Sequence, residues 1–112
     1  MPDNIPHITV QQLAERRQQG ALQLIDVREP PELAIAALED CVHLPLSQFP
    51  KWGPTLQQTL DPHAETIVFC HHGIRSAQMC QWLMDQGFTD VKNVAGGIDA
   101  YAVSIDPSLE RY

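Results

Sequence analysis

The short segment between residues 70 and 76 holds the residue types that group transfer through a cysteine needs. In order, these residues are Cys70, His71, His72, Gly73, Ile74, Arg75 and Ser76. Gly73 allows backbone angles that other residues resist, so the segment can turn tightly. Successive N–H groups in such a turn can converge on an anion. These donors, together with Arg75, would favour the thiolate of Cys70 over the neutral thiol.

A cysteine thiolate in an anion-binding loop can attack sulfur or phosphorus, and Arg75 could hold a bound oxyanion with two parallel hydrogen bonds. The alternative is a structural thiol in the core, which alone is the more common role of a cysteine after an apolar strand. We favour that structural role for Cys80, on an apolar helical stripe, over a resolving partner for Cys70. It also fits Cys41, at the start of a predicted strand.

Short β-branched runs alternate with helical patterns along the chain. The predicted strands are residues 22–27, 41–46, 66–69 and 91–94. The predicted helices lie between Thr9 and Gly20 and at residues 31–39, 55–60, 76–86 and 98–103. This alternation predicts an α/β fold with a parallel sheet covered by helices on both faces. Ligands of such sheets bind beyond the carboxyl ends of the strands, which is where Cys70 falls.

Length and charge bound the functional classes. A chain of 112 residues is enough for one domain. Its net charge of −7 speaks against nucleic acid and anionic membranes as partners. The apolar runs are shorter than the ~20 residues of a membrane span. The start, Met1 to Ile5, lacks the features of a signal peptide, and three cysteines do not suggest a disulfide framework. We therefore expect a cytoplasmic protein.

The pattern Cys-x-x-Gly-x-Arg-Ser after a buried strand resembles the active-site loop of rhodanese-like sulfurtransferases. Residues 24–29 resemble the first central strand of that family, residues 42–46 its next strand, and residues 93–101 its closing segment. The resemblance spans roughly residues 8–101. The sequence departs from it at residues 36–41, where the family usually has Gly-His-Ile-x-Gly-Ala, and at Tyr101, where tryptophan is common.

The resemblance implies a three-layer α/β fold with a parallel five-stranded sheet. It implies a single domain over residues 1–112, with a core at about 8–103 and a tail at 104–112. Cys70 would accept the sulfur atom, and the loop residues His71, His72, Gly73, Ile74, Arg75 and Ser76 would surround the persulfide and the donor. Asp26 and Arg28 would support the site from the neighbouring strand.

The implied activity moves sulfane sulfur from thiosulfate or a persulfide donor to an acceptor such as cyanide, glutathione, thioredoxin or a protein thiol. A second hypothesis is a non-catalytic sulfur carrier or protein-docking module. A phosphatase or arsenate reductase is less favoured, because the related enzymes have a loop one residue longer than the four residues between Cys70 and Arg75.

We expect neither a cofactor nor a metal. Adjacent side chains such as those of His71 and His72 should diverge, and further ligands at metal-binding spacings are missing from the sequence. The two histidines would instead tune the charge of the loop near neutral pH.

Overall fold

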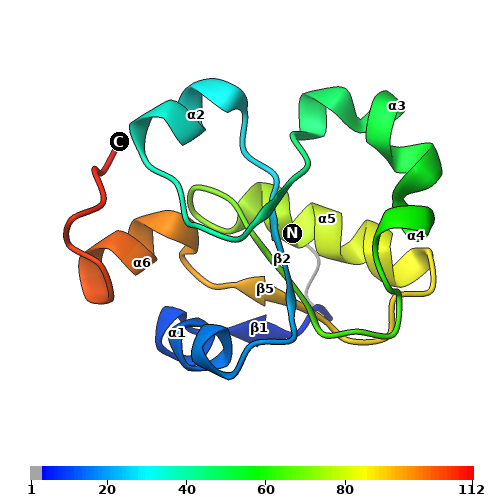
Figure 1. Cartoon of the computed structure of the whole chain (residues 1–112), viewed down its shortest axis with the longest axis horizontal. Coiled ribbons are helices and arrows are strands. Elements are labelled where there is room, and N and C mark those ends of the chain that lie inside the picture. Colours follow the sequence, from blue (N-terminus) through cyan, green and yellow to red (C-terminus); the bar gives the residue numbers. More distant parts are fainter. Residues whose placement is uncertain (1–3) are drawn as a thin grey trace.

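A computed structural model describes residues 4–112 and shows an α/β fold with one parallel sheet (Figure 1). The strands are β1 (His7–Ile8), β2 (Gln23–Asp26), β3 (Val42–His43), β4 (Thr66–Phe69) and β5 (Val91–Val94). The helices are α1 (Val10–Gln19), α2 (Pro30–Ile35), α3 (Phe49–Trp52), α4 (Leu56–Thr59), α5 (Ile74–Asp85) and α6 (Gly97–Ser104), with 3₁₀ turns at Leu46–Gln48 and Gly53–Thr55. The strand order is β1-β5-β4-β2-β3 and every pair is parallel, which confirms the predicted fold class.

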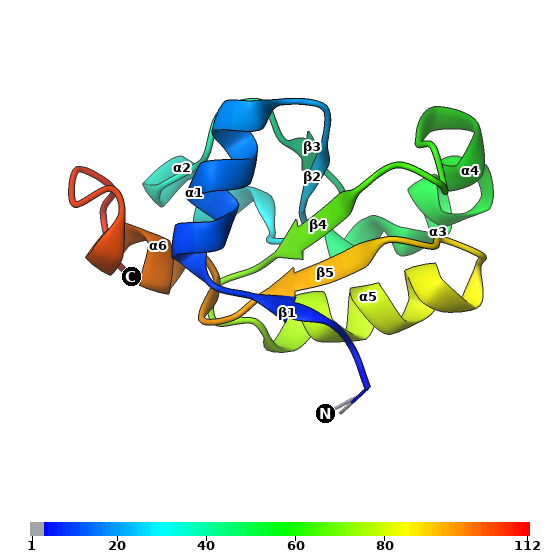
Figure 2. The same ribbon diagram turned by 90° about the horizontal axis from the view of Figure 1, so that it is seen from below.

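Helices cover both faces of the sheet, so the molecule has three layers (Figure 2). The core on the side of α5 and α4 includes Ile25, Leu56, Val68, Met79 and Leu83. The core on the side of α1 and α6 includes Leu13, Leu24, Ile67, Ile98 and Tyr101. The neighbours Ile67 and Val68 thus face opposite cores, which is why β4 reads as one continuous apolar run.

The carboxyl ends of the central strands meet at one edge of the sheet. Asp26, the last residue of β2, lies opposite Phe69, the last residue of β4. The next residue along, Val27, donates its N–H to the Phe69 carbonyl at 3.2 Å. The segment after β2 therefore lies beside the end of β4, where Cys70 follows.

The structure differs from the predicted elements at several places. β3 covers only Val42–His43 of the predicted strand at residues 41–46. β1, which pairs His7 with Asn93 and Ile8 with Val94, is only two residues long and was not predicted. α2 ends at Ile35 rather than at residue 39, because Ala36 is extended and its carbonyl accepts a hydrogen bond from Arg28 at 2.9 Å. α5 begins at Ile74, two residues before the predicted start.

A buried ion pair joins Arg28 to Asp26 at the carboxyl end of β2. The side chains are 0% and 2% exposed, and the closest nitrogen–oxygen distance is 2.8 Å. Further donors and acceptors complete the pair: Arg28 also binds the Ala36 carbonyl, and the N–H of Arg28 donates to Asp26 at 2.9 Å. Such a pair is strongly coupled, because removing one partner leaves a buried charge uncompensated.

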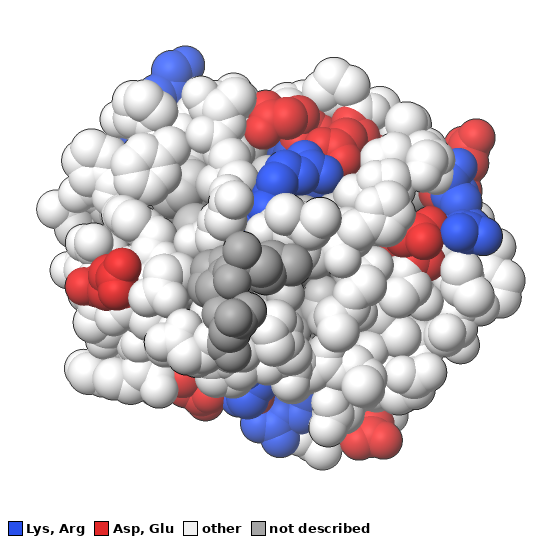
Figure 3. Space-filling view, turned by 180° about the vertical axis from the view of Figure 1, so that it is seen from behind, with Lys and Arg blue, Asp and Glu red and all other residues white. Residues whose placement is uncertain are grey.

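Most of the remaining Lys and Arg side chains pair with carboxylates near the surface. Glu65 binds Arg16 at 2.6 Å and Lys92 at 3.0 Å. On the face shown in Figure 3, most basic side chains lie beside acidic ones rather than forming a continuous basic stripe. Within residues 4–112, none of the helices is long and apolar enough to cross a membrane. Part of the N-terminal segment that we judged not to be a signal peptide, residues 1–3, lies outside the described residues.

Replacing Asp26 by asparagine tests the buried pair. We expect Asp26→Asn to lower the free energy of unfolding by about 3–5 kcal/mol, because Arg28 loses its counter-charge in a buried position. Denaturant unfolding measures this. Arg16→Ala, at a side chain that is 45% exposed, is the control and should cost far less. Equal losses in the two variants would contradict the role of the pair.

Candidate active site

The thiol of Cys70 lies in a cradle of hydrogen-bond donors. Cys70 is the first residue after β4 and is 1% exposed. Its Sγ accepts hydrogen bonds from the N–H of Gly73 at 3.1 Å, the N–H of Ser76 at 3.4 Å and the hydroxyl of Ser76 at 3.3 Å. Ser76 is in the first turn of α5, where N–H groups have no partner within the helix and the helix dipole favours an anion.

These donors decide the charge of the sulfur. Burial raises the pKa of the Cys70 thiol, but the hydrogen bonds from the side chain and N–H of Ser76, and those from the N–H groups of Gly73 and His72, lower it further than burial raises it. The pKa of Cys70 is therefore below the ordinary value of a cysteine, which favours the thiolate form over the neutral thiol. Burial acts unopposed on Cys80 and raises its pKa to about 12, as expected of a core thiol.

Asn93 holds Ser76 in place from the neighbouring strand β5. The Asn93 side chain is buried, accepts from the Ser76 hydroxyl at 2.5 Å and donates to the Gly73 carbonyl at 3.1 Å. The single proton of Ser76 cannot serve both Asn93 and the sulfur. Donation from the Ser76 hydroxyl to the sulfur therefore competes with donation to Asn93.

Two glycines shape the loop. Gly73 has a φ of 102°, and a Cβ there would also lie 3.2 Å from the Val94 carbonyl oxygen. Gly97 has a φ of 60°, and a Cβ there would lie 2.4 Å from the carbonyl oxygen of His71. This close approach lets the first N–H groups of α6 bind the loop: Ile98 donates to Cys70 O at 2.9 Å and Asp99 to His71 O at 3.1 Å. With these carbonyls held by α6, the loop N–H groups are free to face the sulfur.

Arg75 pairs with Glu32 of α2, whereas we expected it to act on the thiolate. The two terminal nitrogens of Arg75 donate to the two carboxylate oxygens of Glu32 at 2.7 and 2.9 Å. The hydrogen bonds from Arg75 lower the pKa of Glu32 to about 2, and Glu32 raises the pKa of Arg75. Both groups therefore stay charged at neutral pH, and the charge of Arg75 is compensated locally.

The last residue of the chain returns to the site. The Tyr112 hydroxyl donates to Glu32 at 2.7 Å and accepts from Arg28 at 3.0 Å. Its ring is stacked on the ring of His71, with centroids 3.8 Å apart and planes at 7°. Figure 1 shows this segment running from α6 to a position beside α2.

The histidines do not diverge, so that part of the sequence interpretation is wrong. The rings of His71 and His72 are 3.8 Å apart, and with Asp99 they place possible ligand atoms within 4.8 Å of one another. However, Asp99 already accepts two hydrogen bonds from Arg111, at 2.9 and 3.2 Å. Burial lowers the pKa of His71, which is therefore neutral at pH 7.

The structure thus brings most of the predicted site residues together. Arg28, which is paired with Asp26, donates to the Tyr112 hydroxyl, and Ile74 is at the rim with 58% exposure. Sequence reasoning missed Glu32, Asn93 and Tyr112. Glu32 had one usable signal, since it closes a capping box with Glu29 at the start of α2. Tyr112 had none, because its contacts join distant parts of the chain.

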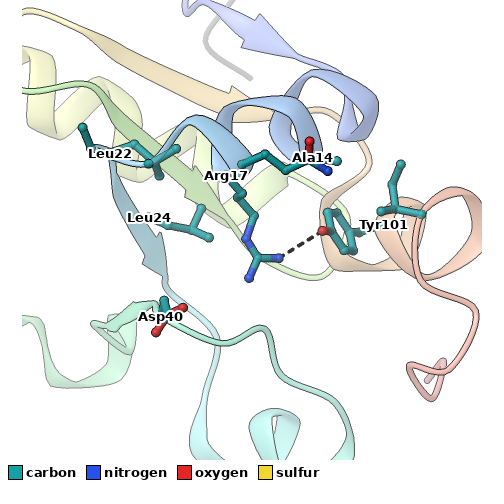
Figure 4. Close-up of a pocket in the computed structure, with 10 residues that line it drawn as sticks. Ala14, Arg17, Leu22, Leu24, Asp40 and Tyr101 are labelled. Carbon is teal, nitrogen blue, oxygen red and sulfur yellow. Dashed lines mark hydrogen bonds between the residues drawn. The ribbon is translucent and has the colours of Figure 1, made fainter.

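A separate cavity of about 500 Å³ lies between α1, β2 and α6 (Figure 4). Arg17 lines it and donates to the Tyr101 hydroxyl at 3.0 Å, with Leu22, Leu24 and Asp40 around it. None of the loop residues 70–76 lines this cavity.

Comparisons with known proteins agree with this geometry. A family model, the rhodanese-like domain, matches residues 9–104. The Arabidopsis thaliana "Rhodanese-like/PpiC domain-containing protein 12, chloroplastic" is 48% identical over 90 residues, which are 80% of this chain and 30% of that protein. A protein of Allochromatium vinosum named "Sulfurtransferase" is 34% identical over 79 residues, 70% of each chain.

The fold is shared with a solved structure. The crystal structure of a rhodanese-like domain protein from Staphylococcus aureus superposes with a TM-score of 0.77 and 25% identity, over 96% of this chain and 99% of that one. The family model spans β2 to β5 and all six α-helices, including the whole Cys70 loop. The chain belongs to the rhodanese-like domain family.

Proposed function

We propose that the protein is a sulfurtransferase in which Cys70 carries sulfane sulfur as a persulfide. The observation that carries this proposal is the set of hydrogen bonds from Gly73 and Ser76 to the Cys70 sulfur. Donors aimed at one sulfur position stabilise an anion there without reorganisation. The Allochromatium relative, which is named a sulfurtransferase, supports the same reaction class.

The reaction has two steps. In the first, the Cys70 thiolate attacks the outer sulfur of the donor, a new sulfur–sulfur bond forms, and the donor's own bond to that sulfur breaks. The donor's electron pair leaves with sulfite, if the donor is thiosulfate, or with a thiolate, if it is a persulfide. In the second step, an acceptor such as cyanide, glutathione, thioredoxin or a protein thiolate attacks the outer sulfur on Cys70. The Cys70 thiolate then leaves and is regenerated.

The cradle supports both steps. It binds the thiolate before attack and again after release, when the sulfur of Cys70 is the leaving group. Arg75, His71, His72 and Ile74 form the surroundings through which donor and acceptor approach. A sulfur carrier that only docks to a partner would use the same cradle for loading, so turnover with a small acceptor such as cyanide distinguishes the enzyme from the carrier.

The compartment and the extent of the protein are part of the proposal. The cytoplasm stays a prediction, because the Arabidopsis relative is named chloroplastic. The division into one domain with a core at 8–103 and a tail at 104–112 also stays a prediction, although Tyr112 packs on the site.

For the proposed function, the first prediction concerns which of the three cysteines carries the transferred sulfur. Cys70→Ser should abolish turnover, because serine is a far weaker nucleophile than a cysteine thiolate. Cys41→Ser and Cys80→Ser should keep most of it, since neither sulfur lies in the cradle. Steady-state assays with thiosulfate and with a persulfide as donor, and cyanide as acceptor, measure this. A folded Cys80→Ser variant that is as inactive as Cys70→Ser would contradict the assignment.

The second prediction concerns the charge of the sulfur. Ser76→Ala should raise the pKa of Cys70 and slow its alkylation at neutral pH on the order of tenfold, because one hydrogen bond to the anion is lost. Above the pKa of both proteins the rates should converge, since the sulfur is then ionised in each. Iodoacetamide rates against pH measure this, with the exposed Ser108→Ala as control. Superimposable profiles for Ser76→Ala and wild type would remove Ser76 from the cradle.

The third prediction concerns phosphate. Four residues separate Cys70 from Arg75, so the loop has too few N–H groups to surround a tetrahedral phosphoryl group while the sulfur attacks its centre. We expect no turnover of an aryl phosphate, and weaker sulfur transfer after insertion of one glycine between Gly73 and Ile74. Aryl phosphate turnover by the wild type that is lost in Cys70→Ser would show that loop length does not set the chemistry.

A further inference from the structure

We propose that Glu32 makes this site selective for persulfide donors, which are attacked in the protonated form R–S–SH, over dianionic thiosulfate, by occupying Arg75. This inference rests on the proposed sulfurtransferase function and adds a residue that determines the donor. It starts from the observation that the arginine of the loop, which could hold the sulfonate of thiosulfate, is already bound to a carboxylate of the same protein.

The ion pair with Glu32 occupies the N–H groups of Arg75 that the sulfonate of thiosulfate would otherwise bind. Both terminal nitrogens of Arg75 bind Glu32, at 2.7 and 2.9 Å. Glu32 is fixed in turn, because one oxygen also accepts from the N–H of Glu29 at 3.0 Å and the other from the Tyr112 hydroxyl at 2.7 Å. A sulfonate must therefore displace a carboxylate that is held by three groups.

The other guanidinium groups around the loop are occupied in the same way. Arg28 is paired with Asp26 at 2.8 Å, and Arg111 with Asp99 at 2.9 Å. Of the two histidines, His71 has a lowered pKa and is neutral. Among the described residues of this edge of the sheet, each arginine thus faces a carboxylate, in a protein with a net charge of −7.

The two donor classes place different charge in the transition state. Attack of the Cys70 thiolate on thiosulfate, which leaves as sulfite, brings a monoanion and a dianion together, three negative charges in all. Attack on a protonated persulfide, R–S–SH, gives a thiolate R–S⁻ and Cys70–S–SH, and involves one negative charge throughout. The N–H groups of Gly73 and Ser76 suit the second case, whereas the first needs an unpaired cation close by.

The test compares, within each variant, the rates of sulfur transfer from two donors. Two rates are measured, at which Cys70 gains sulfur from thiosulfate and from cysteine persulfide. The reactions are quenched at timed intervals and the intact mass of the protein is determined by mass spectrometry. The variants are wild type, Glu32→Gln and the control Glu15→Gln, an exposed residue of α1 that changes the net charge equally. We expect Glu32→Gln to raise the thiosulfate rate relative to the persulfide rate about tenfold, the size of one charge-assisted hydrogen bond. Glu15→Gln should leave the ratio unchanged.

Two further variants show whether the gain acts through Arg75. In Glu32→Gln/Arg75→Ala the increase in the ratio of the thiosulfate rate to the persulfide rate should disappear, because the guanidinium that would bind the sulfonate is gone. Tyr112→Phe removes one hydrogen bond to Glu32 and keeps the ring on His71, so it should shift the ratio in the same direction by a smaller factor. If Glu32→Gln does not fold, Tyr112→Phe replaces it in the comparison with wild type.

The outcomes separate the two proposals. If wild-type Cys70 gains sulfur from neither donor, the proposed function is wrong. If it gains sulfur but the ratio is the same in wild type, Glu32→Gln and Tyr112→Phe, the function stands and the role of Glu32 is overturned. A gain that survives in Glu32→Gln/Arg75→Ala also overturns it.

Discussion

The structure of the site depends on one interaction, the hydrogen bonding of loop N–H groups to the Cys70 sulfur. This interaction needs a parallel sheet that ends at Cys70, a turn at Gly73 and a helix whose first turn donates to the sulfur. It also needs Gly97, because only a glycine lets the start of α6 approach the loop closely enough to hold its carbonyls. The buried strand β4 and the order of the strands thus place the Cys70 sulfur where it is buried and still accepts hydrogen bonds.

Around this cradle the protein compensates charge locally. Burial by itself raises the pKa of a thiol, as in Cys41 and Cys80, both at about 12, so the directed donors at Cys70 reverse the usual effect. The arginines near the loop are paired with carboxylates: Arg75 with Glu32, Arg28 with Asp26 and Arg111 with Asp99. The site therefore stabilises a single negative charge at a fixed point, which distinguishes it from a site that collects anions by an excess of positive charge.

The parts of this arrangement that are local in sequence could be predicted, and those that join distant segments could not. The contacts of Cys70 with Gly73 and Ser76 lie within six residues, so the spacing in the loop was sufficient. The pair of Arg75 and Glu32 joins residues 43 apart, and the contact of Tyr112 with Glu32 joins residues 80 apart. The end of α2 was mispredicted for the same reason, because the Ala36 carbonyl binds Arg28 from a buried ion pair that no local pattern shows. β1 is too short for a periodic pattern.

The central claim is that Cys70, and neither of the other two cysteines, carries the transferred sulfur. Peptide mapping by mass spectrometry after brief incubation of the wild type with cysteine persulfide, followed by removal of free donor, tests it most directly. The account predicts one added sulfur atom on the peptide that contains Cys70, removed by subsequent addition of cyanide. Added sulfur on the peptides of Cys41 or Cys80 in place of Cys70, or none on any of the three, would contradict it.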